Sequence, residues 1–277
     1  MKIRPRKWKN LSSEITLVYA SLSITLVVLL SYFAYQMTSQ VLEERIEQDL
    51  LLTVDQTLRG INAEIEERVR EVQTLALSPT LKQAAARGTQ ATAELGLQDA
   101  PEGVLARRWA ELEQLARPGE ASTFLADMKE WHPYIAEVFI TDRHGIVAGG
   151  SNPTSDIRQD DEAWWREAAK ERFHLSNLEY DESSGTYSYS VALPILDGLG
   201  GPLGVVKAVF NLKAVQELVN SVQLGERGYL VVISRDGRVL RHPDPQYLFR
   251  QIGEVPDLVP VAGILMSSLR GVNDYTP

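Results

Sequence analysis

The sequence predicts an α+β fold: a transmembrane helix, a long second helix, and antiparallel sheet domains in tandem. Three observations carry this prediction. Residues 15–35 are apolar and uncharged, and residues 51–75 repeat apolar side chains every three or four positions. Residues 137–212 instead contain segments that alternate at period two between turn sequences, which indicates strands.

The apolar run at residues 15–35 has the properties of a membrane-spanning helix. At about 1.5 Å per residue it spans the roughly 30 Å hydrocarbon core of a bilayer. A buried core helix of this length would show a polar face, and this run shows none. A cleaved signal peptide would have a shorter apolar region and a small-residue cleavage site, and the sequence after Tyr35 lacks one.

The charges that flank this run predict its orientation. Five bases precede it and no acid appears before Glu14; the bases are Lys2, Arg4, Arg6, Lys7 and Lys9. By the positive-inside rule, the N-terminus is cytoplasmic and the chain after Tyr35 lies outside the cytoplasm. Without those five bases, 23 of the 28 basic residues remain against 37 acidic ones, a net charge of −14. This balance argues against a nucleic-acid partner.

Composition bounds the remaining chemistry. The chain has 277 residues, 44% of them hydrophobic, and no cysteine. Disulfides, thiolate metal sites and cysteine nucleophiles are therefore excluded. The roughly 240 residues beyond the anchor suffice for one large domain or two small ones.

Residues 37–78 predict a long stalk helix, with Gly60 its only glycine and Pro79 directly after it. Its apolar side chains would pack on its own domain, or pair with a second copy in a parallel homodimer, or do both. The proposed seam steps by three and four residues through Leu51, Val54, Leu58, Ile61 and Ile65.

The segments that follow alternate between helices, turns and strands. We predict a loop at 88–103, a helix at 104–116, and a further helix from Ser122, as N-cap, to about residue 131. Strands are predicted at 137–141, 146–148, 173–180, 186–196 and 205–212, with turns at 142–145, 181–185 and 197–204, and helices at 160–172 and 213–222.

A weak internal repeat suggests a second, similar domain. The strand-turn-strand sequence at 139–147 is echoed at 232–239, although a chance match of two short hairpins stays open. One more helix is expected at 260–269, and the second sheet would be incomplete, as in a fragment of a longer protein. The expected segments are a basic leader (1–13), a transmembrane helix (14–36), a stalk helix (37–78), a membrane-distal ligand-binding domain (79–222) and a membrane-proximal domain (223–277).

The order of motifs resembles the double Cache sensor modules of bacterial transmembrane receptors, namely chemoreceptors, sensor kinases, cyclic-dinucleotide enzymes and regulatory phosphatases. The resemblance is carried by residues 138–145, Trp164-Trp165, 189–195, 201–206, 228–233, Asp236-Gly237 and His242-Pro243. It implies two tandem PAS-like antiparallel sheet domains, periplasmic or extracellular, anchored in a bacterial cell (inner) membrane. It also implies that the distal domain binds ligand between the helix with the tryptophan pair and the sheet.

Family members that bind amino acids share an Arg two residues before the Trp, a Tyr about sixteen after it, and an Asp on the strand after G-x-x-G-V. Tyr180 fits this pattern, but position 162 is Glu and position 209 is Val. The missing Arg removes a bidentate carboxylate clamp, and the missing Asp removes an ammonium partner. The resemblance therefore argues against a free α-amino acid held in that way.

The predicted ligand-binding residues are Trp164, Tyr180, Tyr187, Tyr189, Lys207 and Arg158. The four aromatic side chains fall where the family's pocket lies, and the two cations would meet an anionic ligand; each residue has a plain core or surface alternative. Tyr187 and Tyr189 share one face of their strand, and Ser188 and Ser190 share the other. Lys207 has the parity of Val209 on the last strand.

The sequence carries no recognisable catalytic, zinc or nucleotide-binding motif, so we expect neither an enzyme nor a cofactor in this chain. The leading hypothesis is a ligand-sensing input module whose cytoplasmic output lies outside this sequence. A membrane-tethered solute-binding protein without a signalling output is the alternative.

Overall fold

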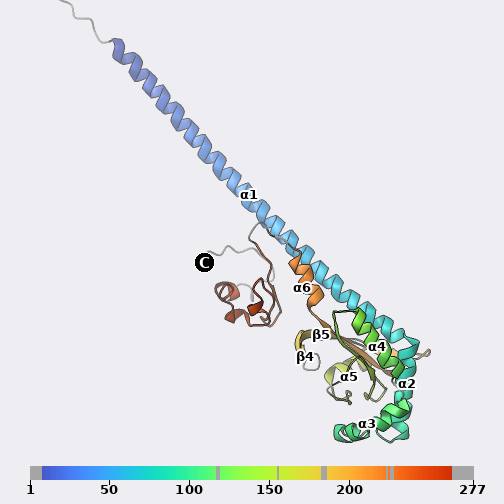
Figure 1. Ribbon diagram of the computed structural model, residues 1–277. Helices are drawn as coiled ribbons and strands as arrows, with labels where there is room; N and C mark the ends of the chain where they lie inside the picture. Colours follow the sequence, from blue (N-terminus) through green and yellow to red (C-terminus); the bar gives the residue numbers. More distant parts are fainter. Residues whose placement is uncertain are drawn as a thin grey trace, which may run out of the picture. The chain divides into compact units, whose positions relative to one another are not determined.

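The structure is a computed structural model that describes residues 8–116, 119–154, 156–181, 186–222, 224 and 228–263 (Figure 1). The chain divides into two compact units, with the boundary between Asp55 and Gln56. The first unit is the start of a long helix. The second holds the rest of that helix, the sheet and the C-terminal segment.

Helix α1 (Trp8–Leu77) is 70 residues long and covers both predicted N-terminal helices. It contains no proline and a single glycine, so nothing in its sequence interrupts it. Its large apolar side chains between residues 15 and 35 are at least 49% exposed. Within the described residues this is one helix long and apolar enough to cross a membrane, with a mean hydropathy of 2.0 in its most apolar stretch.

Helix α2 (Pro79–Glu94) corrects the predicted loop at 88–103, whose first part is helical. Gly88 lies in the middle of α2, against the second strand. A Cβ atom there would lie 2.9 Å from the Ala148 Cβ and 3.2 Å from the Asp142 Cβ. Glycine thus allows close packing at this point, although the same residue made the segment look like a loop in the sequence.

Helix α3 (Glu102–Ala116) confirms the predicted helix at 104–116, and α4 (Gly119–Trp131) begins before the predicted cap. Ser122 lies inside α4. Its hydroxyl accepts a hydrogen bond from the Gly150 backbone N–H at 3.2 Å, so it ties α4 to the sheet and does not cap the helix.

The strands of the second unit form an antiparallel sheet in the order β2-β1-β6-β5-β3, with β4 also paired to β5. They are β1 (Ile135–Thr141), β2 (Val147–Gly150), β3 (His174–Leu175), β4 (Glu179–Asp181), β5 (Thr186–Leu196) and β6 (Pro202–Asn211). The predicted strand at 186–196 is confirmed to the residue. The predicted turn at 181–185 lies largely outside the described residues.

The predicted strand at 173–180 is instead two short strands. His174 pairs with Ala192, and Glu179 pairs with Ser188, so five steps along one strand match four along β5. At the break, the Ser190 backbone N–H donates to the Ser176 hydroxyl at 2.8 Å. A side chain takes the place of a ladder carbonyl there, as at a β-bulge.

The two faces of the sheet are covered differently. One face packs on α1, α2 and α4 through a core that includes Val72, Leu81, Leu125, Val191 and Phe210. The other face carries α5 (Ala163–Glu171) over Phe139, Ala192 and Val205. Helix α3 joins α2 in a smaller cluster around Leu105. Among the described residues, the nine-residue helix α5 and Trp109 of α3 cover part of the second face, and the candidate site lies beside α5.

After α6 (Lys213–Asn220) comes a separate small cluster in residues 228–263. It contains β7 (Val232–Ile233), β8 (Val239–Arg241) and three short 3-10 turns, η1 (Pro245–Tyr247), η2 (Ile252–Glu254) and η3 (Val259–Val261). The echoed sequence is thus a hairpin, around Val239 and Ile252. The described residues do not show a second PAS-like sheet, and most of the helix predicted at 260–269 lies outside them.

Candidate ligand-binding site

A cavity of about 400 Å³ lies between α5, the β3–β4 segment and the sheet. Thirteen residues line it: Glu162, Ala163, Trp164, Glu167, His174, Leu175, Ser176, Asn177, Glu179, Ser188, Ser190, Lys207 and Val209. This is the position in which the sequence predicted a pocket, between the tryptophan helix and the sheet.

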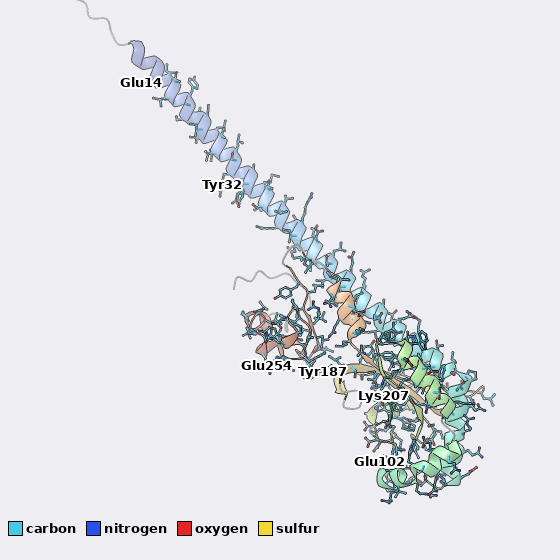
Figure 2. The ribbon with its side chains drawn as sticks, in the orientation of Figure 1. Glu14, Tyr32, Glu102, Tyr187, Lys207 and Glu254 are labelled. Carbon is cyan, nitrogen blue, oxygen red and sulfur yellow. The ribbon has the colours of Figure 1, made fainter. Side chains whose placement is uncertain are left out.

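The sheet side of the cavity is built around Lys207 and Trp164. The Lys207 Nζ lies 4.5 Å from the centroid of a Trp164 ring and 5.8 Å from that of Phe139. The two aromatic rings meet edge to face, with centroids 5.8 Å apart. Trp164 is only 8% exposed, so α5 is seated on the sheet through this residue. Lys207, labelled in Figure 2, thus presents an ammonium group beside an aromatic wall.

The second tryptophan of the pair fixes α5 instead of lining the cavity. The Trp165 Nε1–H donates to the Thr141 Oγ1 at 2.9 Å, and the Val205 backbone N–H donates to the same oxygen at 3.2 Å. Thr141 is fully buried. One hydroxyl thus links α5, β1 and β6 and holds the cavity's helix in place.

The opposite wall is the broken β3–β4 segment. His174 Nδ1 lies 2.6 Å from a carboxylate oxygen of Glu167 on α5, which joins this wall to the helix. The Ser176 N–H donates to the Ser190 carbonyl at 2.9 Å. The break at Ser176 leaves Asn177 and Glu179 along the cavity.

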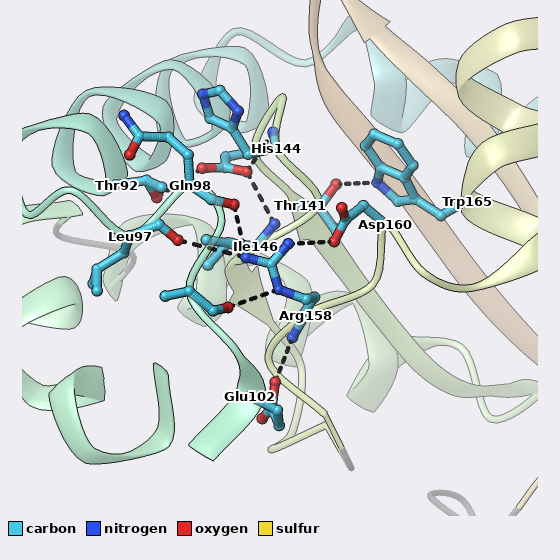
Figure 3. A network of polar contacts seen from close by, with 12 residues as sticks. Thr92, Leu97, Gln98, Glu102, Thr141, His144, Ile146, Arg158, Asp160 and Trp165 are labelled. Atoms are coloured by element: carbon cyan, nitrogen blue, oxygen red, sulfur yellow. Dashed lines mark hydrogen bonds and ion pairs between the residues drawn. The ribbon is translucent and has the colours of Figure 1, made fainter. Parts of the chain in front are cut away.

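Arg158, a predicted ligand cation, serves a different contact (Figure 3). Its Nε donates to the Ala100 carbonyl at 3.0 Å, and its two terminal nitrogens bond to the Gln98 carbonyl and the Asp160 carboxylate, each at 2.7 Å. Its backbone N–H donates to Glu102 at 3.0 Å. Arg158 therefore joins the loop before α5 to the start of α3, and it is not among the residues that line the cavity.

Tyr189 and Tyr187 point to the other face of β5. Tyr189 is 8% exposed and lies 5.5 Å from Phe210, centroid to centroid, in the core beneath α1. Burial there raises the pKa of its hydroxyl well above the ordinary value. Tyr187 stacks on Phe249 at 4.2 Å, and its hydroxyl accepts a hydrogen bond from Arg238 at 3.1 Å. The structure thus separates both tyrosines from Trp164 and Lys207.

Of the remaining positions singled out in the sequence, the structure describes the side chains of some but not of Tyr180. Tyr180 pairs with Tyr187 through its backbone in β4, but its side chain lies outside the described part of the structure. Positions 162 and 209, where the chain departs from the amino-acid pattern, both line the cavity. The sequence analysis missed Ser188, Ser190 and Glu179 as lining residues. Strand alternation could have indicated the two serines, because Ser188 and Ser190 lie on the face of β5 opposite to Tyr187 and Tyr189.

A second cavity, of about 390 Å³, lies between α3 and the edge strand β2. It is lined by Trp109, Glu113, Ser122, Val147, Gly149, Gly150, Asn152, Pro153, Thr154 and Ile157. No sequence-predicted site residue lines it. Among the described residues there is no group of three or more His, Asp or Glu side chains that could hold a metal ion.

Comparison with known proteins identifies the family. A family model described as the Cache domain, of the double Cache type, matches residues 38–276. The chain belongs to the Cache domain family. The predicted resemblance is thus confirmed. The chain is a Cache domain, and Cache domains are small-ligand sensing input modules. Together with the candidate N-terminal membrane helix, the family implies a membrane-anchored, extracellular sensor domain.

Among curated proteins, the methyl-accepting chemotaxis protein PctB of Pseudomonas aeruginosa is 27% identical over 150 residues. The match covers 52% of this chain and 23% of PctB, so the chain spans about a quarter of that protein's length.

Among solved structures, the sensor domain of the V. cholerae histidine kinase DctB is 16% identical with a TM-score of 0.50, covering 78% of this chain and 75% of that one. The ligand-binding domain of the Pseudomonas aeruginosa PAO1 amino-acid chemoreceptor PctC, solved with GABA, is 20% identical with a TM-score of 0.45. That comparison covers 72% of this chain and 76% of the other. At 16% identity, the DctB comparison shows a shared fold.

Proposed function

We propose that this Cache domain is the input module of a bacterial transmembrane receptor and that it binds its ligand in the cavity beside α5. The observation that carries the proposal is the cavity next to Trp164 and Lys207, on the sheet face that α5 covers only in part. Lys207, Trp164 and Val209 all line this cavity. Signalling through a chemoreceptor, kinase, cyclase or phosphatase output would follow.

The contacts of Tyr187 provide a route from the cavity to residues 228–263. Asn177 and Glu179 line the ligand cavity and also a second space that Tyr187, Ser234 and Arg238 share. Arg238 bonds both the Tyr187 hydroxyl and the Phe249 carbonyl, the latter at 2.8 Å. A ligand that moves the β3–β4 wall would therefore also move Tyr187, and with it the contacts of Tyr187 with Phe249 and Arg238.

A thermal-shift screen of small metabolites on the chain in detergent tests ligand binding. A ligand at 100 times its Kd raises stability by about 2.7 kcal/mol. Trp164→Ala should reduce the shift strongly, because Trp164 lines the cavity, whereas Trp131→Ala should not, because Trp131 is 81% exposed at the end of α4, away from the cavity. A shift that survives Trp164→Ala unchanged would place the ligand elsewhere.

The proposed topology places the N-terminus in the cytoplasm. The bases before Glu14 and the acids after Tyr35 support it. Alkaline phosphatase fused to the C-terminus of the chain should be active, and a reporter that fluoresces only in the cytoplasm should be dark. The reverse result would invert the topology.

We also propose a parallel homodimer through α1. Val54 and Leu58 are 41% and 53% exposed, whereas Ile65 packs against the chain's own core, so the seam would lie before Ile61. Single Cys variants oxidised in membranes should crosslink best at Leu51, Val54 and Leu58 and poorly at Gln56, two residues and about 200° around the helix from Val54. Uniform or absent crosslinking would remove this seam.

The five segment boundaries given by the sequence (1–13, 14–36, 37–78, 79–222 and 223–277) complete the proposal, with the last as a membrane-proximal, PAS-like domain. The β7–β8 hairpin and the family match to residue 276 support it.

A tethered solute-binding protein is the second candidate. A gene that continues into a membrane span and a signalling domain would favour the receptor, and a stop codon soon after Pro277 would favour tethering.

A further inference from the structure

The cavity beside α5 carries more acidic than basic side chains. Three carboxylates line it, Glu162, Glu167 and Glu179, against one lysine and one histidine. His174 is already in contact with Glu167 at 2.6 Å. Glu162 and Glu179 form no ion pair with any described residue. Two carboxylates on facing walls, one at the start of α5 and one on β4, therefore stay available to a ligand.

The sheet between these walls presents two hydroxyls that the protein leaves without partners. Ser188 is 4% exposed and Ser190 is 7% exposed, and both line the cavity. Within the described residues neither side-chain hydroxyl makes a hydrogen bond; the Ser190 backbone N–H, by contrast, donates to Ser176. Both hydroxyls therefore remain open to the cavity and can bond to a polar molecule bound there.

The available groups are mostly hydrogen-bond acceptors. Carboxylates only accept, and a serine hydroxyl accepts through two lone pairs. An ammonium group has three donors and no acceptor, so it complements such a set. The bases offset this preference only in part: Lys207 is one ammonium group among three carboxylates in the cavity lining, and Arg158 bonds to carbonyls outside the cavity.

We propose that the ligand of this cavity is a small organic amine, bound as a cation between Glu162 and Glu179 with Ser188 and Ser190 beneath it. This rests on the proposed function of the same cavity. An anionic ligand would bring like charge to the two carboxylates. The ligand class therefore differs from a carboxylate held by an Arg clamp.

The test is isothermal titration calorimetry of the whole chain in detergent, with small compounds of matched chain length as ligands. These are 1,4-diaminobutane, 4-aminobutanoic acid and butanedioic acid, which carry a double positive, a balanced and a double negative charge, together with primary monoamines of two to six carbons. The amines should bind most tightly and butanedioic acid most weakly. Raising the salt concentration should weaken amine binding, because the rim carboxylates are exposed to solvent.

The variants separate a specific site from general attraction to an acidic protein. Glu179→Gln and Glu162→Gln should each weaken amine binding about tenfold, which corresponds to about 1.4 kcal/mol. Ser190→Ala should weaken it less. Glu171→Gln is the matched control: it removes the same charge from the end of α5, outside the cavity, and should leave binding unchanged.

The outcomes distinguish this inference from the proposed function. If no amine binds while an anion or an uncharged compound does, with loss on Lys207→Met, the cavity is a ligand site and the amine assignment is wrong. If Glu171→Gln weakens amines as much as Glu179→Gln does, the attraction is non-specific and the assignment also fails. If no compound of any charge binds, the proposed function of the cavity fails with it.

Discussion

Two hairpins with similar sequences, at 139–147 and 232–239, have different surroundings. In the first, Asp142 is fully buried and accepts hydrogen bonds from the backbone N–H groups of His144 and Ile146 at 2.8 and 2.9 Å. Its other oxygen accepts from the Thr92 hydroxyl of α2 at 2.8 Å. In the second, Ser234 holds the corresponding position: its hydroxyl accepts a hydrogen bond from the Arg238 backbone N–H at 3.0 Å, and the side chain of the nearby Asp236 is 62% exposed. The same turn forms in both hairpins, and in the first a covering helix, α2, makes the side chain that caps the turn part of the core.

The largest expected effect of this difference is on stability. Asp142→Ala leaves two backbone N–H groups and a hydroxyl without their buried acceptor, and should cost about 4 kcal/mol in the free energy of unfolding. Asp236→Ala removes an exposed carboxylate and should stay within about 0.5 kcal/mol. Urea unfolding of the two variants measures both. Equal losses would mean that α2 contributes nothing to the first turn.

The glycines of the turns should also differ in their tolerance of alanine. Gly145 has φ +80°, and a Cβ there would lie 2.6 Å from the backbone nitrogen of Asp160. Gly145→Ala therefore combines left-handed strain with a clash, about 3 kcal/mol together. Gly200, in the β5–β6 turn, has φ +85° and open space around it, so Gly200→Ala should show the strain alone, about 1 kcal/mol. Urea unfolding would overturn this account if the second loss matched the first.

The contact of Tyr187 with residues 228–263 should contribute less to the free energy of unfolding. Tyr187→Phe keeps the stack on Phe249 but removes the acceptor of the Arg238 hydrogen bond, with an expected cost of about 1 kcal/mol. Tyr229→Phe is a matched control at a 46% exposed ring. A smaller ligand response in residues 228–263, measured by hydrogen exchange, should accompany only the first change. An unaltered response would exclude the Tyr187 route.

The smallest effect is a difference in titration between two turns of the first sheet. Burial raises the pKa of Asp142, whereas backbone N–H groups of Gly201 and Leu199 lower the pKa of Asp197. A raised folded-state pKa favours the protonated form, so the Asp142 contribution is full below its unfolded pKa and is lost as pH rises through the folded value. The Asp197 contribution is present above its unfolded pKa and is lost as pH falls through the folded value. Carboxyl NMR titration should show the opposite shifts; shifts of the same sign would contradict the burial of Asp142.

Much of the fold followed from local sequence patterns, and the exceptions involve tertiary contacts. Period two gave β5 its exact bounds, and parity placed Lys207 and Val209 along the cavity. Gly88 looked like a loop because glycine weakens a helix, but its lack of a Cβ lets α2 approach Ala148. The strand at 173–180 broke because the Ser176 side chain accepts a ladder hydrogen bond, which no periodicity reveals.

The sequence predicted where the candidate site lies but not all of the residues that line it. The aromatic pair indicated the helix, but the predicted face of β5 was that of Tyr187 and Tyr189, whereas the structure turns Ser188 and Ser190 toward α5. Arg158 was a reasonable cation in the sequence. The carbonyl groups that it binds, at Gln98 and Ala100, belong to a loop about sixty residues away, and only the folded chain brings them together.

The most direct test of the central claim is hydrogen exchange of the whole chain in detergent, with and without a compound that stabilises it. Binding beside α5 predicts slower exchange in residues 162–171, 174–179 and 186–192, which bound the cavity. Residues 103–112 and 147–154, around the cavity at α3, should be unchanged. Protection confined to those residues would contradict the assignment and move the ligand to the cavity between α3 and β2.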